Sequence, residues 1–238
     1  MKFRPLSLGD PAYVARLTPP AINPDSFSGL VRWWAADSLV PIPDNTHITA
    51  HWVDQKNGDN ADTGSEGGGG NNLYRTNAFG SKPGIDGVDF QYTTFAFGDF
   101  TVVSVAKISA DTYMIGHATL NHQVRVSRSG ANNLSFFSGS GVEVISNNMT
   151  NPRTDARCMV WRRSGVNVSF RENKTVLGNT NGNTNGTSFT PNRIGFSSNG
   201  GWPGGGRLGE ILIYSAAVSD ANLDSLYDNY LKGRWGLP

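Results

Sequence analysis

Paired carboxylates are the first side chains to consider, because two Asp or Glu residues about 5–5.5 Å or 6.5–9.5 Å apart can hydrolyse a glycosidic bond. The chain has four glutamates, and Glu143, Glu172 and Glu210 have no second carboxylate within five residues. A pair from distant strands, Asp86 or Asp89 with Glu210, stays open, although Glu210 is more simply an edge or loop contact. We therefore predict no catalytic residues and no enzyme, with glycoside hydrolysis as the remaining enzymatic alternative.

Nucleophilic and zinc sites find less support in the sequence. No G-x-S-x-G turn, which would expose a catalytic serine, occurs in the chain. His47 and His51 fall in a predicted strand, where residues four apart share a face at about 13 Å. His117 and His122 flank a predicted turn and are interpreted as polar surface residues. The sequence therefore predicts no zinc site.

Carbohydrate binding is the chemistry that these residue types suit best. An aromatic ring stacks on the C–H face of a sugar, and amide or charged groups bond its hydroxyls. Trp202 lies between Gly-rich segments, which predict a loop and not a place in the hydrophobic core. Asn199 and Arg207 flank it. These three residues are the predicted glycan site. The alternative is that Trp202 covers the edge of the domain or packs on a neighbouring subunit.

The carboxy-terminal residues predict a strand followed by one amphipathic helix. Glu210–Tyr214 alternates as a strand does, Ser219 offers an N-cap oxygen, and Asp220 puts negative charge in the first helical turn. Lys232 and Gly233 predict the end of the helix. One helical face recurs with the 3.6-residue period and must be buried: Leu223, Leu226, Tyr227, Tyr230 and Leu231.

The rest of the chain predicts strands separated by Gly-containing turns, hence an antiparallel β-sandwich. Phe100–Ile108 is apolar on both faces and predicts a strand that is central or lies under a subunit contact. Asp59–Asn72 and residues 178–187 are predicted as surface loops. The clearest strands are Leu30–Ala35, Ile48–Val53, Val88–Tyr92, Phe100–Ile108, Val124–Ser127, Leu134–Phe137, Val142–Ile145, Cys158–Arg162 and Val166–Arg171.

The carboxy-terminal pattern resembles that of laminin G-like and concanavalin A-like jelly-roll domains, of the kind carried by phage and bacterial surface proteins. Its motifs are E-I-x-x-Y, then S-D opening a helix, then Y-L-x-x-x-W-G, here Glu210, Ile211, Tyr214, Ser219, Asp220, Tyr230, Leu231, Trp235 and Gly236. The resemblance covers roughly residues 27–237. It implies an all-β jelly-roll sandwich and little about function, because this fold serves lectins, adhesins, enzymes and structural modules.

The same resemblance raises two specific expectations. Glucanases of this fold carry E-x-D-x-x-E on one strand, and this chain lacks that pattern. Sandwiches of this kind often hold calcium with loop carboxylates and carbonyls. No resident cofactor is otherwise expected, and the calcium candidates are Asp54, Asp59, Asp62, Asp86 and Asp89.

Composition excludes several classes of protein. Only 16% of residues are charged and the net charge is +1, which argues against nucleic-acid binding. The pairs Arg125/Arg128 and Arg162/Arg163 are interpreted as solvated strand faces. The single cysteine, Cys158, is interpreted as a buried, inert thiol. No signal peptide and no membrane span are visible, so synthesis in a host cytoplasm is expected.

Residues 1–27 are predicted to form an extended arm ahead of the sandwich at residues 28–238. Its prolines fix φ and remove backbone donors, and Phe3, Leu6 and Tyr13 would anchor it on a partner. The alternative is an arm that wraps its own domain or a frayed terminus.

The functional prediction is a non-enzymatic module of a virus particle, as capsid decoration, head fibre or spike, or tail component. Its partners would be capsid or tail proteins, a host-surface glycan and further copies of itself in a homo-oligomer. The alternative is a soluble lectin-like protein or a glycoside hydrolase.

Overall fold

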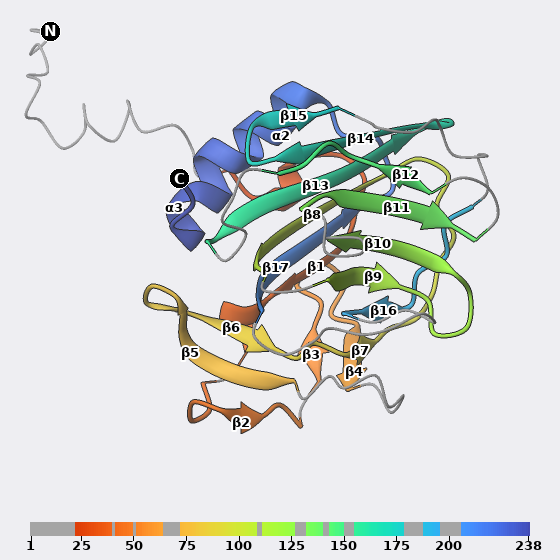
Figure 1. The fold of residues 1–238 in the computed structure, drawn as a ribbon. Coiled ribbons are helices and arrows are strands. Elements are labelled where there is room, and N and C mark those ends of the chain that lie inside the picture. The colour runs from red at the N-terminus through yellow and green to blue at the C-terminus, as the bar shows by residue number, and fades with distance from the viewer. Residues whose placement is uncertain are drawn as a thin grey trace, which may run out of the picture.

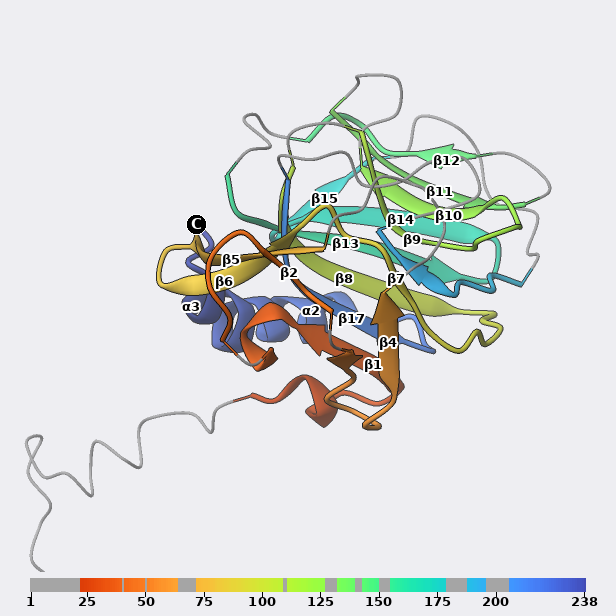
Figure 2. The same ribbon diagram turned by 90° about the horizontal axis from the view of Figure 1, so that it is seen from below.

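The protein folds as two antiparallel β-sheets packed face to face, with a carboxy-terminal helix on the outside of one sheet (Figure 1). Seen from below, the layers are helix, larger sheet and smaller sheet (Figure 2). This computed structural model describes residues 22–39, 41–49, 51–63, 72–108, 111–126, 132–139, 143–149, 155–178, 188–195 and 206–238. The predicted antiparallel sandwich with one carboxy-terminal helix is therefore confirmed.

The larger sheet has nine strands within the described residues. In spatial order they are β15 (Thr175–Leu177), β14 (Asn167–Glu172), β13 (Arg157–Ser164), β8 (Phe100–Lys107), β17 (Arg207–Tyr214), β6 (Lys82–Asp86), β5 (Leu73–Phe79) and β2 (Thr46–His47), with β1 (Leu30–Ala35) pairing β17 beside β6.

The smaller sheet has eight strands in the part of the chain that the structure describes. Their order is β12 (Val144–Ile145), β11 (Leu134–Ser138), β10 (His122–Val126), β9 (Thr112–Gly116), β16 (Arg193–Ile194), β7 (Phe90–Gln91), β4 (Asn60–Thr63) and β3 (Trp52–Val53).

Aromatic side chains fill the space between the two sheets. Trp34 contacts Tyr92 with ring centroids 5.0 Å apart, and Phe100 packs between Phe136 and Phe189 at 5.1 and 5.2 Å. All five rings are buried. Removing this much apolar surface from water is the main driving force for forming the sandwich.

Strand β8 confirms the prediction of a central strand, since it lies between β13 and β17 and its side chains are buried on both faces. The smaller sheet covers one face and the carboxy-terminal helix lies over the other (Figure 2). Because the second layer is the chain's own helix, this burial requires no neighbouring subunit. The predicted homo-oligomer stays a prediction.

The helix begins as predicted and ends later. The Ser219 hydroxyl accepts a hydrogen bond from the Asn222 amide at 3.3 Å. The chain then runs through α2 (Asp220–Leu226), a π-helical turn η3 (Tyr227–Leu231) and α3 (Lys232–Trp235). The predicted end at Gly233 is wrong, because the left-handed residue that stops a helix is Gly236, with φ +65°.

Two short 3₁₀ turns flank β1, namely η1 (Pro24–Ser26) and η2 (Ala36–Ser38). Pro24 is buried, and its carbonyl accepts a hydrogen bond from the Tyr214 hydroxyl at 3.1 Å. Residues 22–27 of the predicted arm thus contact β17. The anchors Phe3, Leu6 and Tyr13 lie outside the described residues.

Three local predictions are wrong. Among the described residues of the predicted strand Ile48–Val53, only Trp52–Val53 is a strand, because the chain passes here from β2 in one sheet to β3 in the other. The predicted loop Asp59–Asn72 begins with β4, whose Ala61 is buried. Arg163 is fully buried, since it donates to the Phe97 and Gly98 carbonyls beside two aromatic rings.

Helix length and polarity bear on membrane insertion. Among the described residues, every helix is too short or too polar to cross a membrane.

Candidate functional site

The five predicted calcium ligands do not converge. Each aspartate contacts a basic side chain: Asp54 and Asp59 contact Arg32 at 3.3 and 2.7 Å, Asp62 contacts His51, Asp86 contacts Arg75 and Arg207 at 3.1 and 2.9 Å, and Asp89 contacts Arg193 at 3.1 Å. Within the described residues, no three His, Cys, Asp or Glu side chains are placed to hold a metal ion. Calcium binding stays a prediction of the sequence.

Asp54 has a structural task that explains its burial. Its Oδ1 accepts hydrogen bonds from the backbone amides of Trp33 and Lys56, both at 2.8 Å. Burial raises the pKa of this carboxyl group, and the backbone amides and Arg32 oppose the shift. The carboxylate therefore closes the turn after β3 and ties it to β1.

The predicted glycan residues divide between described and undescribed parts of the chain. Trp202 and Asn199 lie outside the described residues. Arg207 begins β17, donates to the Gly206 carbonyl at 2.7 Å and pairs with Asp86. Its charge is therefore already compensated by a buried carboxylate.

Glu210 is buried, which corrects the interpretation of it as an edge or loop contact. Its Oε1 accepts from Trp33 Nε1 at 2.6 Å and from the Tyr230 hydroxyl at 2.8 Å, and its Oε2 accepts from Trp235 Nε1 at 2.5 Å. Burial raises the pKa of Glu210, while Arg234 and these three donors oppose the rise. The family-like motif is thus a device that fixes the helix to the sheet.

A row of side chains crosses the outward face of the smaller sheet. The strand registers place six residues opposite one another on six successive strands: Asp62, Gln91, Arg193, Gly116, Gln123 and Phe137. Their chain neighbours Ile194 and Val124 are fully buried in the core. Because strand side chains alternate between faces, the row points away from the core. We call these six residues the outward row.

A second line of residues runs beside the outward row. Tyr113, Arg125, Ser135 and Ile145 lie opposite one another on β9, β10, β11 and β12. The Arg125 guanidinium lies over the Tyr113 ring, 5.2 Å from its centroid, and pairs with Asp111 at 3.8 Å. The face therefore combines carboxamide, guanidinium, hydroxyl and aromatic groups.

Two polar groups on this face have unused hydrogen-bonding capacity. Gln123 is 5% exposed and Ser135 is fully buried. Neither Gln123 Oε1 nor Ser135 Oγ has a hydrogen-bond partner among the described residues. A buried polar atom without a partner costs roughly 1–3 kcal/mol, so such atoms favour a ligand or water that bonds them.

Gly116 and Gly195 shape the middle of the outward row. Gly116 has no side chain, and Arg193 and Gln123 lie on the two strands beside it, two strand spacings or roughly 10 Å apart. Gly195 follows β16 with φ +79°, and a Cβ there would collide with the Val88 carbonyl.

His117 and His122 lie near this face, and the interpretation of them as polar surface residues is wrong for His122. Their ring centroids are 6.2 Å apart, and His122 is buried. His122 Nδ1 accepts from the Thr190 amide at 3.0 Å, and His117 Nδ1 accepts from the Leu120 amide at 3.0 Å. Burial lowers the pKa of both rings. Both therefore act as neutral acceptors that hold loops next to β9 and β10.

Apart from Asp62, which was a predicted calcium ligand, the residues of the outward row were not singled out in the sequence. Arg125 lies within the predicted strand Val124–Ser127, and Gln123 directly precedes it. Their alternation with the apolar Val124 was the pattern that could have indicated an outward-facing pair. The juxtaposition with Gln91 and Arg193 depends on the pairing of strands far apart in the chain.

Comparisons with known proteins agree with this architecture. No protein-family model matches the sequence, and a search of curated proteins finds no match. Domain 4 of AbnA, a GH43 extracellular arabinanase from Geobacillus stearothermophilus solved with arabinotriose, resembles the chain with a TM-score of 0.58 and 14% identity, over 84% of this chain and 99% of that one.

Sialidase from Trypanosoma rangeli, in complex with a difluoro-KDN, gives a TM-score of 0.51 at 12% identity. The match covers 84% of this chain and 32% of the sialidase chain, so the likeness is to about a third of that protein. These likenesses establish the β-sandwich fold.

Proposed function

We propose that this chain is a non-enzymatic carbohydrate-binding domain that uses the outward row of the smaller sheet. The observation that carries the proposal is the row itself. Arg193 and Gln123 stand on either side of Gly116, with 1% and 5% of their surface exposed, and the exposed Gln91 and the partly buried Phe137 continue the row on the two sides. Planar carboxamide and guanidinium groups suit the paired hydroxyls of a sugar ring, because each offers two bonding atoms in one plane.

The unused groups favour a ligand rich in hydroxyls. Gln123 Oε1 and Ser135 Oγ accept hydrogen bonds, and a sugar hydroxyl both donates and accepts. Arg193 is held by Asp89 at 3.1 Å, which fixes its position before any ligand arrives. A preorganised polar surface loses less entropy on binding than a mobile one.

Binding without cleavage is proposed because three buried carboxylates that could serve a glycosidase have other tasks. Glu210 fixes the helix, Glu172 pairs with Arg157, and Asp89 pairs with Arg193. A glycosidase needs one carboxylic acid and one carboxylate on either side of the scissile bond. Docking of the domain on a virus particle through Phe3, Leu6 and Tyr13 stays a prediction of the sequence.

Isothermal titration with neutral oligosaccharides tests the proposal. Arabinotriose comes first, because the AbnA domain was solved with it, followed by cellotriose and maltotriose. We expect Gln123→Ala combined with Ser135→Ala to weaken binding about 10-fold or more, which corresponds to roughly 1.4 kcal/mol for two lost hydrogen bonds. The control is Gln55→Ala, which removes the same side chain from an exposed turn.

Two outcomes would count against the proposal, and a third experiment tests Trp202. Binding that is unchanged in the double variant, with an unaltered melting temperature, would remove the outward row from the site. Release of reducing sugar by the wild type would make the chain an enzyme. Loss of binding in Trp202→Ala on a glycan array would support the predicted role of that residue, and unchanged binding would end it.

A further inference from the structure

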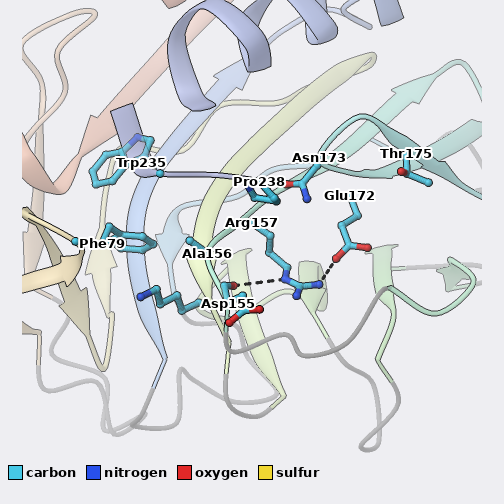
Figure 3. Close-up of a pocket in the computed structure, with 12 residues that line it drawn as sticks. Phe79, Asp155, Ala156, Arg157, Glu172, Asn173, Thr175, Trp235 and Pro238 are labelled. Carbon is cyan, nitrogen blue, oxygen red and sulfur yellow. Dashed lines mark hydrogen bonds and ion pairs between the residues drawn. The ribbon is translucent and has the colours of Figure 1, made fainter. Parts of the chain in front are cut away.

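A cleft of about 630 Å³ lies at the end of the larger sheet where β8 ends and β13 begins (Figure 3). It is bounded by the end of α3, by the turn between β5 and β6, and by the β14–β15 hairpin. Its volume falls within the roughly 300–1,000 Å³ that small-molecule sites occupy.

Two aromatic side chains form one wall of the cleft. Phe79 and Trp235 meet edge to face, with ring centroids 5.2 Å apart and an interplanar angle of 73°. Gly209 permits this contact, since a Cβ there would lie 3.1 Å from both rings. The Lys107 ammonium lies 5.4 Å from the centroid of Phe79. This wall is therefore fixed by packing.

The opposite wall is polar and equally fixed (Figure 3). Arg157 and Glu172 form an ion pair, with side chains 6% and 5% exposed. Asn173 Oδ1 accepts from the Cys158 amide at 3.0 Å, which leaves its NH₂ group as the donor toward the cleft. Asp155 and Thr175 are exposed at the rim.

The charges that line the cleft balance. Lys107 and Arg157 are positive, and Asp155 and Glu172 are negative, so the side chains that line the cleft sum to no net formal charge. An ionic ligand would gain no net attraction to offset its desolvation. An uncharged ligand with many hydroxyls can bond the ammonium, carboxylate, amide and hydroxyl groups in turn.

We propose that this cleft is a second site for a neutral sugar, separate from the outward row. The inference rests on the proposed carbohydrate-binding function for its ligand class and on the cleft for its position. Because the two sites share no residue, one molecule would bind two glycan chains. Multivalent attachment of this kind raises avidity without any new contact.

Titration of arabinotriose, cellotriose and maltotriose into the full chain tests the proposal by stoichiometry. We expect two sites in the wild type and one in Thr175→Trp, which fills the cleft from an exposed rim position. The matched control is Ser215→Trp, exposed beyond the far end of β17, which should keep two sites. Lys107→Met, which retains the aliphatic stem, should weaken the cleft site about 10-fold. Trigalacturonate should not compete at the cleft.

The outcomes separate the two proposals. One site that disappears in the Gln123→Ala and Ser135→Ala double variant and persists in Thr175→Trp would overturn the cleft and leave the proposed function standing. One site that disappears only in Thr175→Trp would overturn the outward row and keep the cleft. No binding of any of the three trisaccharides would overturn both.

Discussion

At the scale of single residues, the most informative group is a buried carboxylate that receives three donors. Glu210 bonds Trp33 from β1 and Tyr230 and Trp235 from the helix, so one side chain joins three segments. Tyr230 and Trp235 are five residues apart, more than one α-helical turn. The wider π-helical turn η3 takes up the extra residue and lets both side chains reach the same carboxylate.

Replacing Glu210 by Gln should destabilise the fold by about 1–3 kcal/mol, because one buried donor loses its acceptor. The amide oxygen can still accept from Trp33 and Tyr230, but its NH₂ group would face the Trp235 N–H. Urea denaturation followed by tryptophan fluorescence measures the change. Glu143→Gln, at a half-buried position before β12, is the control and should shift the midpoint far less. Equal shifts would show that Glu210 has no special role.

Protonation of His122 should make the stability of the fold depend on pH. Burial lowers its pKa, with smaller contributions from His117 and Arg163, so the folded protein binds a proton less readily than the unfolded chain. Stability from this group is therefore complete above the unfolded pKa of about 6.5 and is lost as the pH falls below it. Protonation would also remove the acceptor of the Thr190 amide.

We expect the melting temperature of the wild type to fall between pH 7.5 and pH 5.5. His122→Asn keeps an acceptor and cannot titrate, so its melting temperature should change less over this range. His47→Asn, at an exposed position in β2, should follow the wild type. An identical pH profile for wild type and His122→Asn would refute the assignment.

At the scale of elements, the sequence predicted those strands and helix ends that depend on the residues of the segment itself. Strand β8 was predicted to within a residue because all its side chains except that of Lys107 are buried, and the start of α2 because Ser219 is a capping residue. Where two local signals competed, the tertiary contact decided. Gly233 and Gly236 both suit a helix end, and the helix continues to Gly236 because Trp235 must reach Glu210.

The candidate sites were harder to predict for the same reason. The outward row joins β7, β16 and β10, and no periodicity within a strand specifies which distant strand will lie beside it. The cleft depends on Gly209, whose missing side chain makes room for Trp235 and Phe79. Asp86 and Asp89 looked like metal ligands because the arginines that pair with them lie far away in the sequence.

At the scale of the whole molecule, the helix and the sandwich share one buried layer. Cys158 lies in that layer, on the face of β13 that the helix covers, and burial raises the pKa of its thiol to about 12. A thiol with such a pKa is almost wholly protonated at neutral pH, and the thiolate is the reactive form. The predicted burial of Cys158 is confirmed, and its inertness stays a prediction.

Cys158 should therefore report whether helix and sandwich unfold together. If they form one cooperative unit, labelling by a thiol reagent in urea should begin at the concentration where tryptophan fluorescence changes. Arg171→Met removes the contacts of this buried arginine with Asp220 and Asp224 on the helix, so labelling should then begin at lower urea. Arg75→Met, whose partner Asp86 keeps Arg207, is the control and should leave the two transitions coincident. Rapid labelling of the native wild type would show that the helix detaches on its own.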